Sequence, residues 1–320
     1  MSDVSGQQEN LREAATHSAT GTSADAVTMR RAAVSTRRTG RSSLFLDAMH
    51  RLFRNKLAIA GMVIMGVFIL TAIFAPLLSP YDPLQQELMM RRRPPSQEHW
   101  FGRDDLGRDI LSRVIYGARL SLQVGVLSVG FAIVIGALIG AVASFAGGWV
   151  DSIVMRLMDI MLAFPALLLA IAIVTILGPG LLNMLYAIGI VSIPAYARTM
   201  RASVLAVKEQ DYILAARSVG VPPLRMLLRN VVPNCLTPII VEGTLGIGTA
   251  ILDAAGLSFL GLGAQPPEPE WGAMLGQGRY SMFTAPHIVL FPGLAIMLTV
   301  LGFNLLGDGL RDALDPRLRT

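Results

Sequence analysis

Two carboxylates interrupt a long apolar stretch, and they are the side chains there with the clearest capacity for chemistry. Glu242 and Asp253 lie within Leu236–Leu262, which is otherwise free of charged residues. A spacing of eleven residues places both on nearly one face of a helix. A carboxylate inside a bilayer costs about 3 kcal/mol unless it faces water or a polar partner. The pair therefore indicates either a polar translocation path that attracts a cationic group, or an interhelical hydrogen bond with Glu242 near the interface.

A polar and basic insert, Glu209–Pro238, precedes this stretch and separates two apolar segments. Its periodicity predicts two short amphipathic helices, the first at Asp211–Val219 and the second beginning at Pro222-Pro223. Gly220 is expected to end the first helix. The second helix carries one expected apolar stripe: Leu224, Leu227, Leu228 and Val231. The insert is either a stiff element that receives force from a soluble partner, or an ordinary loop with an interfacial helix.

Motifs for catalysis and for metal or nucleotide binding are missing from the sequence. It contains no G-x-x-x-x-G-K-[ST], no H-E-x-x-H and no G-x-S-x-G. Asp253 has no second aspartate within a span, as a paired-aspartate membrane protease would need. The four histidines show no metal-ligand spacing, and Cys235 is the single cysteine. We therefore predict no catalytic residues, no metal site and no cofactor bound by this chain.

Composition identifies the class of protein. The chain has 320 residues, of which 53% are hydrophobic and only 15% are charged, whereas soluble domains carry about 25% charged residues. This predicts an all-α membrane protein that crosses the bilayer several times and is surrounded by lipids. The net charge of +5 is attributed to membrane topology rather than to nucleic-acid binding.

Uncharged stretches of membrane-spanning length predict six transmembrane helices. The stretches are Leu57–Leu78, Leu120–Val150, Ile160–Ala197 (two spans divided at Gly178-Pro179-Gly180), Leu236–Leu262 and Ile288–Gly307. Asp151–Asp159 is expected to be a short polar link. Gly136 and Gly140 form a small-xxx-small pair that favours close helix packing.

The remaining segments are polar. Residues 1–43 are interpreted as a disordered cytoplasmic tail, and an interfacial helix beginning at residue 44 leads into the first span, which ends at 78. Residues 79–119 are expected to form an extracytoplasmic loop, residues 120–307 a five-helix core, and residues 308–320 a cytoplasmic tail. Six spans place both termini on one side. That side holds 19 Lys and Arg residues against eight on the other, which favours cytoplasmic termini.

The stretch 214–233, L-A-A-R-S-V-G-(x9)-N-V-V-P, resembles the E-A-A-x3-G-x9-I-x-L-P signature of binding-protein-dependent ABC importer permeases. Leu214 stands where that signature has Glu, which leaves Glu209 or Asp211 to supply a carboxylate. HWFGRDDLGRDILSRVIYGARLSL, MRLMDIMLAFP, PNCLTPIIV, AILDAAGLSFLGLGAQPPEPEWGAML and FNLLGDGLRDALDP also resemble this family. They are similar to the C-type permease subunit of dipeptide, oligopeptide and nickel importers, with the dipeptide permease subunit as the nearest likeness.

This resemblance implies a type I importer fold in the bacterial cytoplasmic (inner) membrane. It implies a B-type permease that shares the pathway, two ATP-binding cassette subunits that bind ATP, and an extracytoplasmic solute-binding protein. The segment 198–235 would be the coupling loop, and seven residues would form the contact with the ATPase: Asp211, Leu214, Ala215, Ala216, Arg217, Gly220 and Pro233.

The expected substrates are dipeptides or short peptides. The same machinery importing oligopeptides, glutathione or nickel is an alternative. A proton-coupled secondary transporter that uses Glu242 and Asp253 as a relay is an alternative of another class.

Overall fold

The computed structural model describes residues 49–314. The chain divides into two compact units, 1–51 and 52–320, and all of the elements named below belong to the second. The predicted tail at 1–43, the start of the interfacial helix at 44–48 and residues 315–320 of the C-terminal tail lie outside the described residues. The elements are α3 (Lys56–Ile73), α4 (Ala75–Leu78), η1 (Leu88–Met90), α5 (Ile110–Ala146), α6 (Gly148–Leu162), α7 (Ala166–Leu177), α8 (Leu181–Lys208), α9 (Asp211–Ser218), α10 (Pro223–Met226), η2 (Leu227–Val231), α11 (Val232–Phe259), α12 (Trp271–Gly278), η3 (Arg279–Ser281) and α13 (His287–Leu314).

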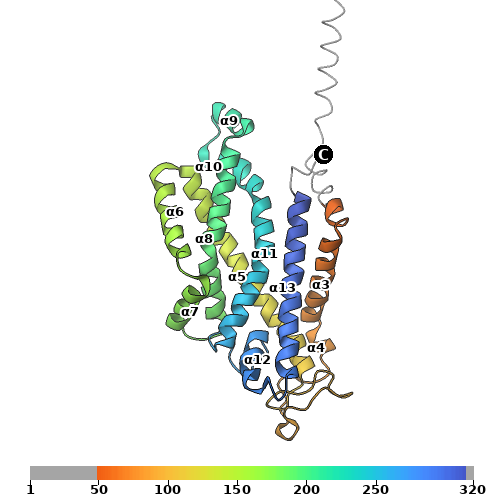
Figure 1. Ribbon diagram of the computed structural model, residues 1–320. Coiled ribbons are helices and arrows are strands. Elements are labelled where there is room, and N and C mark those ends of the chain that lie inside the picture. Colours follow the sequence, from red (N-terminus) through yellow and green to blue (C-terminus); the bar gives the residue numbers. More distant parts are fainter. Residues whose placement is uncertain (1–48, 315–320) are drawn as a thin grey trace, which may run out of the picture. The chain divides into compact units, whose positions relative to one another are not determined.

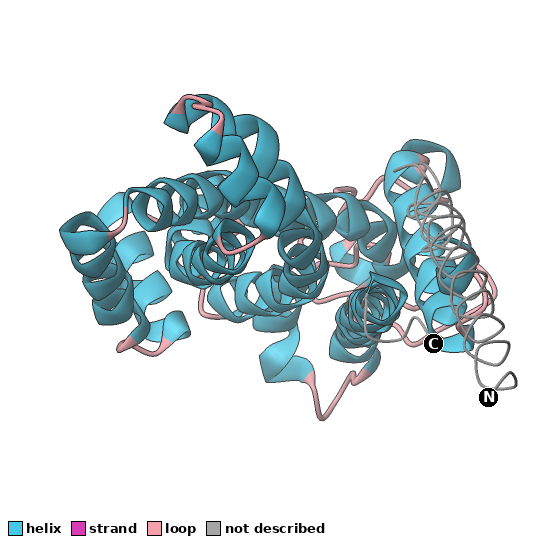
Figure 2. Ribbon diagram, turned by 90° about the horizontal axis from the view of Figure 1, so that it is seen from above, coloured by secondary structure: helices cyan, strands magenta, loops and turns pink. Residues whose placement is uncertain are grey.

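Long helices run side by side in this unit, as the two views of Figures 1 and 2 show. Helix α11 contacts α5, α8 and α13, while α3 packs on α13. The short helix α9 projects at one end of the bundle, and α12 lies at the opposite end (Figure 1). We call these the α9 end and the α12 end. The start of α3 and the end of α13 meet at the α9 end, where Asn55 Nδ2 donates a hydrogen bond to Asp312 Oδ2 at 3.4 Å.

Small residues allow α5 and α8 to pack closely. A Cβ atom added at Gly136 would lie 2.7 Å from the Ile193 carbonyl oxygen, and one added at Gly140 would overlap the Ala197 carbonyl. The predicted role of the Gly136 and Gly140 pair in helix packing is therefore confirmed. Side chains at these positions would push α8 away from the centre of the bundle.

The expected all-helical architecture is confirmed over the described residues. Five helices are long and apolar enough to cross a membrane, and the pair α6 and α7 supplies a sixth span if it is counted as one bent element. The two helices of this pair meet at 91°. The interruption follows from Pro165, which has no backbone N–H to continue α6 and restricts the residue before it.

Helix α6 also contains Asp151–Asp159, so the expectation of a short polar link there is wrong. Both acids bind arginines of α8. Arg201 donates from Nε and Nη2 to the Asp151 carboxylate at 2.7–3.0 Å, and Arg198 donates to Asp159 at 2.7 Å. These ion pairs allow a charged segment to remain helical along the bundle.

Helix α5 begins at Ile110, inside the predicted polar segment 79–119. Asp109 caps it, because its carboxylate accepts a hydrogen bond from the Ser112 backbone N–H at 2.8 Å. The charge of Arg113 in the first turn is buried against the 79–109 segment, with only 1% of the side chain exposed. The uncharged stretch that begins at Leu120 therefore marks only part of α5. The helix starts earlier, where its charged residues have polar partners.

Candidate functional site

The α9 end presents a short helix that is closed by a specific turn. Gly220 has a positive φ of 76° and follows the last turn of α9. Its N–H donates to the Arg217 carbonyl, and the Val221 N–H donates to the Ala216 carbonyl, at 3.1 and 3.2 Å. This pair of bonds is a Schellman motif, in which a glycine suits the left-handed position. Gly220 thus ends the helix as predicted, and α10 begins at Pro223 after the expected Pro-Pro pair.

One side of α9 is anchored and the other is exposed. Ile213 is buried in a cluster with Met200 and Val204 of α8, and Ala216 packs at its margin. Asp211, Ala215 and Arg217 are exposed. Leu214 is 49% exposed and Val219 80% exposed. The position that holds Glu in the resembling signature therefore presents an accessible apolar side chain.

The second predicted helix is only partly as expected. Helix α10 continues through the π-helical turn η2 into α11, and Pro233 lies in the first turn of α11. A proline there cannot donate to the preceding turn, which accounts for the wider winding before it. Leu227 and Val231 are buried, but Leu224 and Leu228 are 67% and 60% exposed. The predicted single apolar stripe is thus divided between the core and the surface.

The structure does not bring Glu242 and Asp253 together. Both are half-buried on α11, and a rise of ~1.5 Å per residue separates them by roughly 16 Å along the helix. The Glu242 carboxyl lies beside the Thr199 hydroxyl of α8. The Tyr196 hydroxyl lies against Gly246, one turn further along α11. Glu242 is therefore part of a polar contact between two spans, and Asp253 is a separate position.

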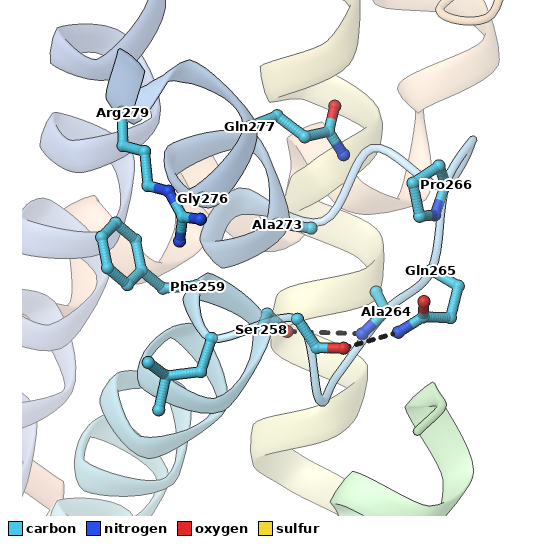
Figure 3. A pocket seen from close by; sticks show the side chains of 11 residues that line it. Ser258, Phe259, Ala264, Gln265, Pro266, Ala273, Gly276, Gln277 and Arg279 are labelled. Atoms are coloured by element: carbon cyan, nitrogen blue, oxygen red, sulfur yellow. Dashed lines mark hydrogen bonds between the residues drawn. The ribbon is translucent and has the colours of Figure 1, made fainter. Parts of the chain in front are cut away.

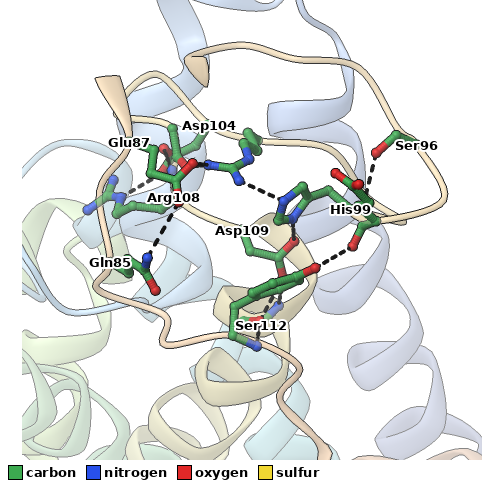
Figure 4. A network of polar contacts seen from close by, with 12 residues as sticks. Gln85, Glu87, Ser96, His99, Asp104, Arg108, Asp109 and Ser112 are labelled. Carbon is green, nitrogen blue, oxygen red and sulfur yellow. Dashed lines mark hydrogen bonds and ion pairs between the residues drawn. The ribbon is translucent and has the colours of Figure 1, made fainter. Parts of the chain in front are cut away.

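The α12 end contains a network of polar contacts built from the 79–109 segment (Figure 4). Arg103 pairs with Glu87 at 2.6 Å, and its Nη2 also lies 2.7 Å from His99 Nε2. Arginine can only donate, so His99 Nε2 accepts and the ring hydrogen is on Nδ1. That Nδ1–H donates to Asp109 at 2.9 Å. The network holds a long segment, in which η1 is the single helical turn, against the start of α5.

A hollow of about 210 Å³ lies between the end of α11 and α12 (Figure 3). Ser258 Oγ accepts a hydrogen bond from the Ala264 N–H at 3.4 Å, and Gln265 donates to the Gly261 carbonyl at 3.0 Å. Arg279 lies over the Phe259 ring, 5.8 Å from its centroid. The chain after α11 is therefore folded back as a fixed turn beside α12.

Glu270 caps α12 from a position that is only 1% exposed. Its carboxylate accepts hydrogen bonds from the Gly272 and Ala273 N–H groups and from Ser121 Oγ of α5, at 2.8–3.2 Å. Burial raises the pKa of Glu270 above its ordinary value, although these hydrogen bonds act in the opposite direction. Sequence reasoning missed this residue. Glutamate is not among the usual N-cap residues, so only the acid directly before the apolar run at Trp271 could have indicated it.

No group of three or more metal-ligating side chains occurs within residues 49–314. The described chain offers an accessible turn-capped helix at one end, half-buried acids within α11, and a rigid platform at the other end. These features suit a protein that moves relative to partners, and they do not assemble a nucleophile with a base.

Comparisons with known proteins agree with this architecture. Residues 132–320 match the family model described as binding-protein-dependent transport system inner membrane component. Residues 43–95 match the N-terminal transmembrane domain of oligopeptide transport permease C.

Three curated proteins illustrate the similarity. The chain is 53% identical to the dipeptide transport system permease protein DppC of Alkalihalophilus pseudofirmus, over 86% of this chain and 90% of that protein. It is 51% identical to the di/tripeptide transport system permease protein DppC of Pseudomonas aeruginosa, over 83% and 89%. It is 49% identical to the glutathione transport system permease protein GsiD of Escherichia coli, over 84% and 89%.

A chain of the MetNI methionine ABC transporter in an inward-facing conformation has a similar fold. The TM-score is 0.54 at 18% identity, with 64% of this chain and 97% of that chain covered. This likeness supports the arrangement of the helices alone.

Proposed function

Because this chain belongs to the family of binding-protein-dependent transport system inner membrane components, we propose that it is the permease subunit of an ATP-driven importer for dipeptides or short peptides. The observation that carries the substrate class is the identity of 49–53% to permeases named for dipeptides, di/tripeptides and glutathione. All three names describe short peptides. Oligopeptides and nickel remain as outcomes of the transport test.

The proposed assembly contains other chains. A B-type permease shares the pathway, two ATP-binding cassette subunits bind ATP, and a solute-binding protein delivers the substrate. This chain carries no phosphate-binding motif of its own, so the energy of ATP hydrolysis must arrive through contact. The assembly lies in the bacterial inner membrane, with the α9 end on the cytoplasmic side.

Helix α9 is the proposed coupling element. Its buried face, centred on Ile213, transmits movement to α8, while Leu214 and Val219 offer an exposed apolar surface to the ATPase. Asp211 and Arg217 flank this surface. Pro233 and the π-helical turn connect it to α11, which carries Glu242 and Asp253 as the proposed lining of the pathway.

Uptake measurements test the proposal. Cells that lack the gene and complemented cells are compared for uptake of a labelled dipeptide, first with ATP depleted and then with the proton gradient collapsed. We expect uptake to return with the gene and to stop only on ATP depletion. Uptake that follows the proton gradient would instead support a secondary transporter. Equal uptake by both strains would reject dipeptides, and glutathione, oligopeptides and nickel would be tested in turn.

A further inference from the structure

Arg113 is a buried charge whose hydrogen bonds are incomplete. Its Nη1 donates to the Pro83 and Pro267 carbonyls at 3.1 and 3.5 Å. Its Nε and Nη2 are buried and have no hydrogen-bond partner. Asp104 Oδ2 lies 3.6 Å from Nε, within ion-pair range but beyond hydrogen-bonding distance. Unpaired buried donors on a charged group are costly, so this edge of the guanidinium favours a ligand.

Asp104 does not give Arg113 a hydrogen bond, because its carboxylate is directed at Arg108 and at the Leu106 backbone. It accepts hydrogen bonds from Arg108 Nε at 2.6 Å and from the Arg108 and Leu106 N–H groups at 2.9 Å. The neighbouring Asp105 is paired with Arg92. Neither carboxylate therefore supplies a hydrogen bond to the Nε and Nη2 edge of Arg113.

The unpaired edge has the geometry of a carboxylate receptor. Nε and Nη2 lie on the same side of a guanidinium and form a fork for two carboxylate oxygens. Elsewhere in this chain the same two nitrogens of Arg201 bind Asp151 at 2.7–3.0 Å. Arg113 presents this fork without such a partner.

Arg113 and Arg108 line a hollow of about 310 Å³ between the 79–109 segment and α12. Gln277, which accepts a hydrogen bond from Arg108 at 3.0 Å, also lines it. The carboxylates of Asp104 and Asp105, paired with Arg108 and Arg92, also line it, and the remaining walls are apolar and include Ile110, Met274 and Ile288. A positive edge beside apolar walls suits a carboxylate that is attached to a small apolar group.

We infer that this hollow is a binding site for the carboxyl-terminal residue of a short peptide, with the Arg113 fork on the carboxylate and the apolar walls around the side chain. The choice of a peptide as the source of the carboxylate rests on the proposed function. The site would hold the peptide at the α12 end of the permease, away from the α9 end where the ATPase is proposed to dock.

Thermal unfolding of the transporter tests the inference without transport. The full chain is purified with its permease and ATPase partners but without the solute-binding protein, which would bind peptide itself. Glycyl-leucine, glycyl-leucinamide and sodium acetate are added at constant ionic strength. Binding to the folded protein raises the unfolding temperature. We expect glycyl-leucine to stabilise, acetate to do so at higher concentration, and the amide to have no effect.

Paired variants assign the effect to the site. Arg113→Gln is expected to weaken the apparent affinity for glycyl-leucine by about tenfold or more, since a charge-assisted hydrogen bond is lost. Arg93→Gln, at an exposed arginine of the same segment, should leave it unchanged. Should Arg113→Gln fail to fold, Leu106 offers a second route, because it lines the hollow and is 36% exposed. Leu106→Glu would place a tethered carboxylate there and abolish the response, whereas Leu106→Gln would retain it.

Three results would overturn the inference: equal stabilisation by the acid and the amide, a response that survives both Arg113→Gln and Leu106→Glu, or a response to acetate without one to glycyl-leucine. The last would show a carboxylate site that does not accept free peptides. Uptake in complemented cells is measured separately. If cells take up dipeptide in an ATP-dependent manner but glycyl-leucine does not stabilise the purified transporter, the inferred site is wrong and the proposed function still holds.

Discussion

Replacement of Gly220 by Ala tests whether the turn after α9 holds the helix in shape. The glycine has φ of 76°, and no atom lies within 4 Å of the position that a Cβ would take. The cost is therefore conformational rather than steric. A left-handed conformation costs a residue with a Cβ roughly 1–2 kcal/mol, partly offset by lower entropy in the open state. We expect a net loss of about 1 kcal/mol in the local stability of the turn.

Hydrogen exchange measures this loss directly. The Val221 N–H donates to the Ala216 carbonyl only while the turn is formed. A loss of ~1 kcal/mol in opening free energy makes its exchange about fivefold faster. Gly66→Ala is the matched control, because Gly66 also has no neighbour within 4 Å but lies inside α3 without a positive φ. Gly220→Asn should fall between wild type and Gly220→Ala, since Asn tolerates this conformation better.

Unchanged exchange at Val221 in Gly220→Ala would refute the role assigned to the Schellman turn. Equal acceleration in Gly66→Ala would show that the effect is not local. Faster exchange with unchanged uptake would show that the turn stabilises the end of α9 but is not required for coupling.

Three further predictions concern other parts of the chain. Gly140→Ala should lower the thermal stability of the purified protein by about 1–3 kcal/mol, because the added Cβ overlaps the Ala197 carbonyl, whereas Gly130→Ala, with no neighbour within 4 Å, should not; equal effects would contradict the close packing of α5 and α8. Because the pKa of Glu270 is raised in the folded protein, the folded state binds more protons than the unfolded state. Stability should therefore fall as pH rises from the ordinary carboxyl pKa to the raised one. The unfolding temperature plotted against pH should have a smaller slope in Glu270→Gln, and an unchanged slope would exclude Glu270 as the source of this pH dependence. Ala216→Arg should insert into the membrane normally yet lose ATP-driven uptake, because Ala216 packs at the margin of the cluster that anchors α9; normal uptake by membranes with equal protein content would count against α9 as the coupling element.

Local patterns predicted several features correctly because their causes lie within a few residues. The Gly220 turn depends on the backbone of a single helix end, and the start of α10 depends on Pro222-Pro223. The glycine pair of α5 was recognisable because small residues four positions apart form one strip on a helix. The proposed coupling residues were found from the resemblance of 214–233 to a family signature, and their contact with an ATPase remains a prediction.

Other features depend on residues that are distant in the sequence. Asp151 and Asp159 suggested a polar link because their partners Arg201 and Arg198 belong to another helix. Arg113 lies in the segment predicted to be an extracytoplasmic loop, and its burial there could not be predicted, because the Pro83 and Pro267 carbonyls that bind it come from both sides along the chain. The sequence does not predict that Leu224 and Leu228 are exposed while Leu227 and Val231 are buried, since all four are apolar at helical spacing.

The class of protein, its apolar spans and its family could be predicted from contiguous residues, because hydropathy and short motifs are local properties. The partners of the charged residues in the spans and in the 79–109 segment, the bend between α6 and α7, and the unpaired edge of Arg113 depend on how the chain folds. A buried charge is stable only with a partner at hydrogen-bonding distance. Folding selects that partner from remote parts of the chain, as when Ser121 of α5 meets Glu270 at the start of α12.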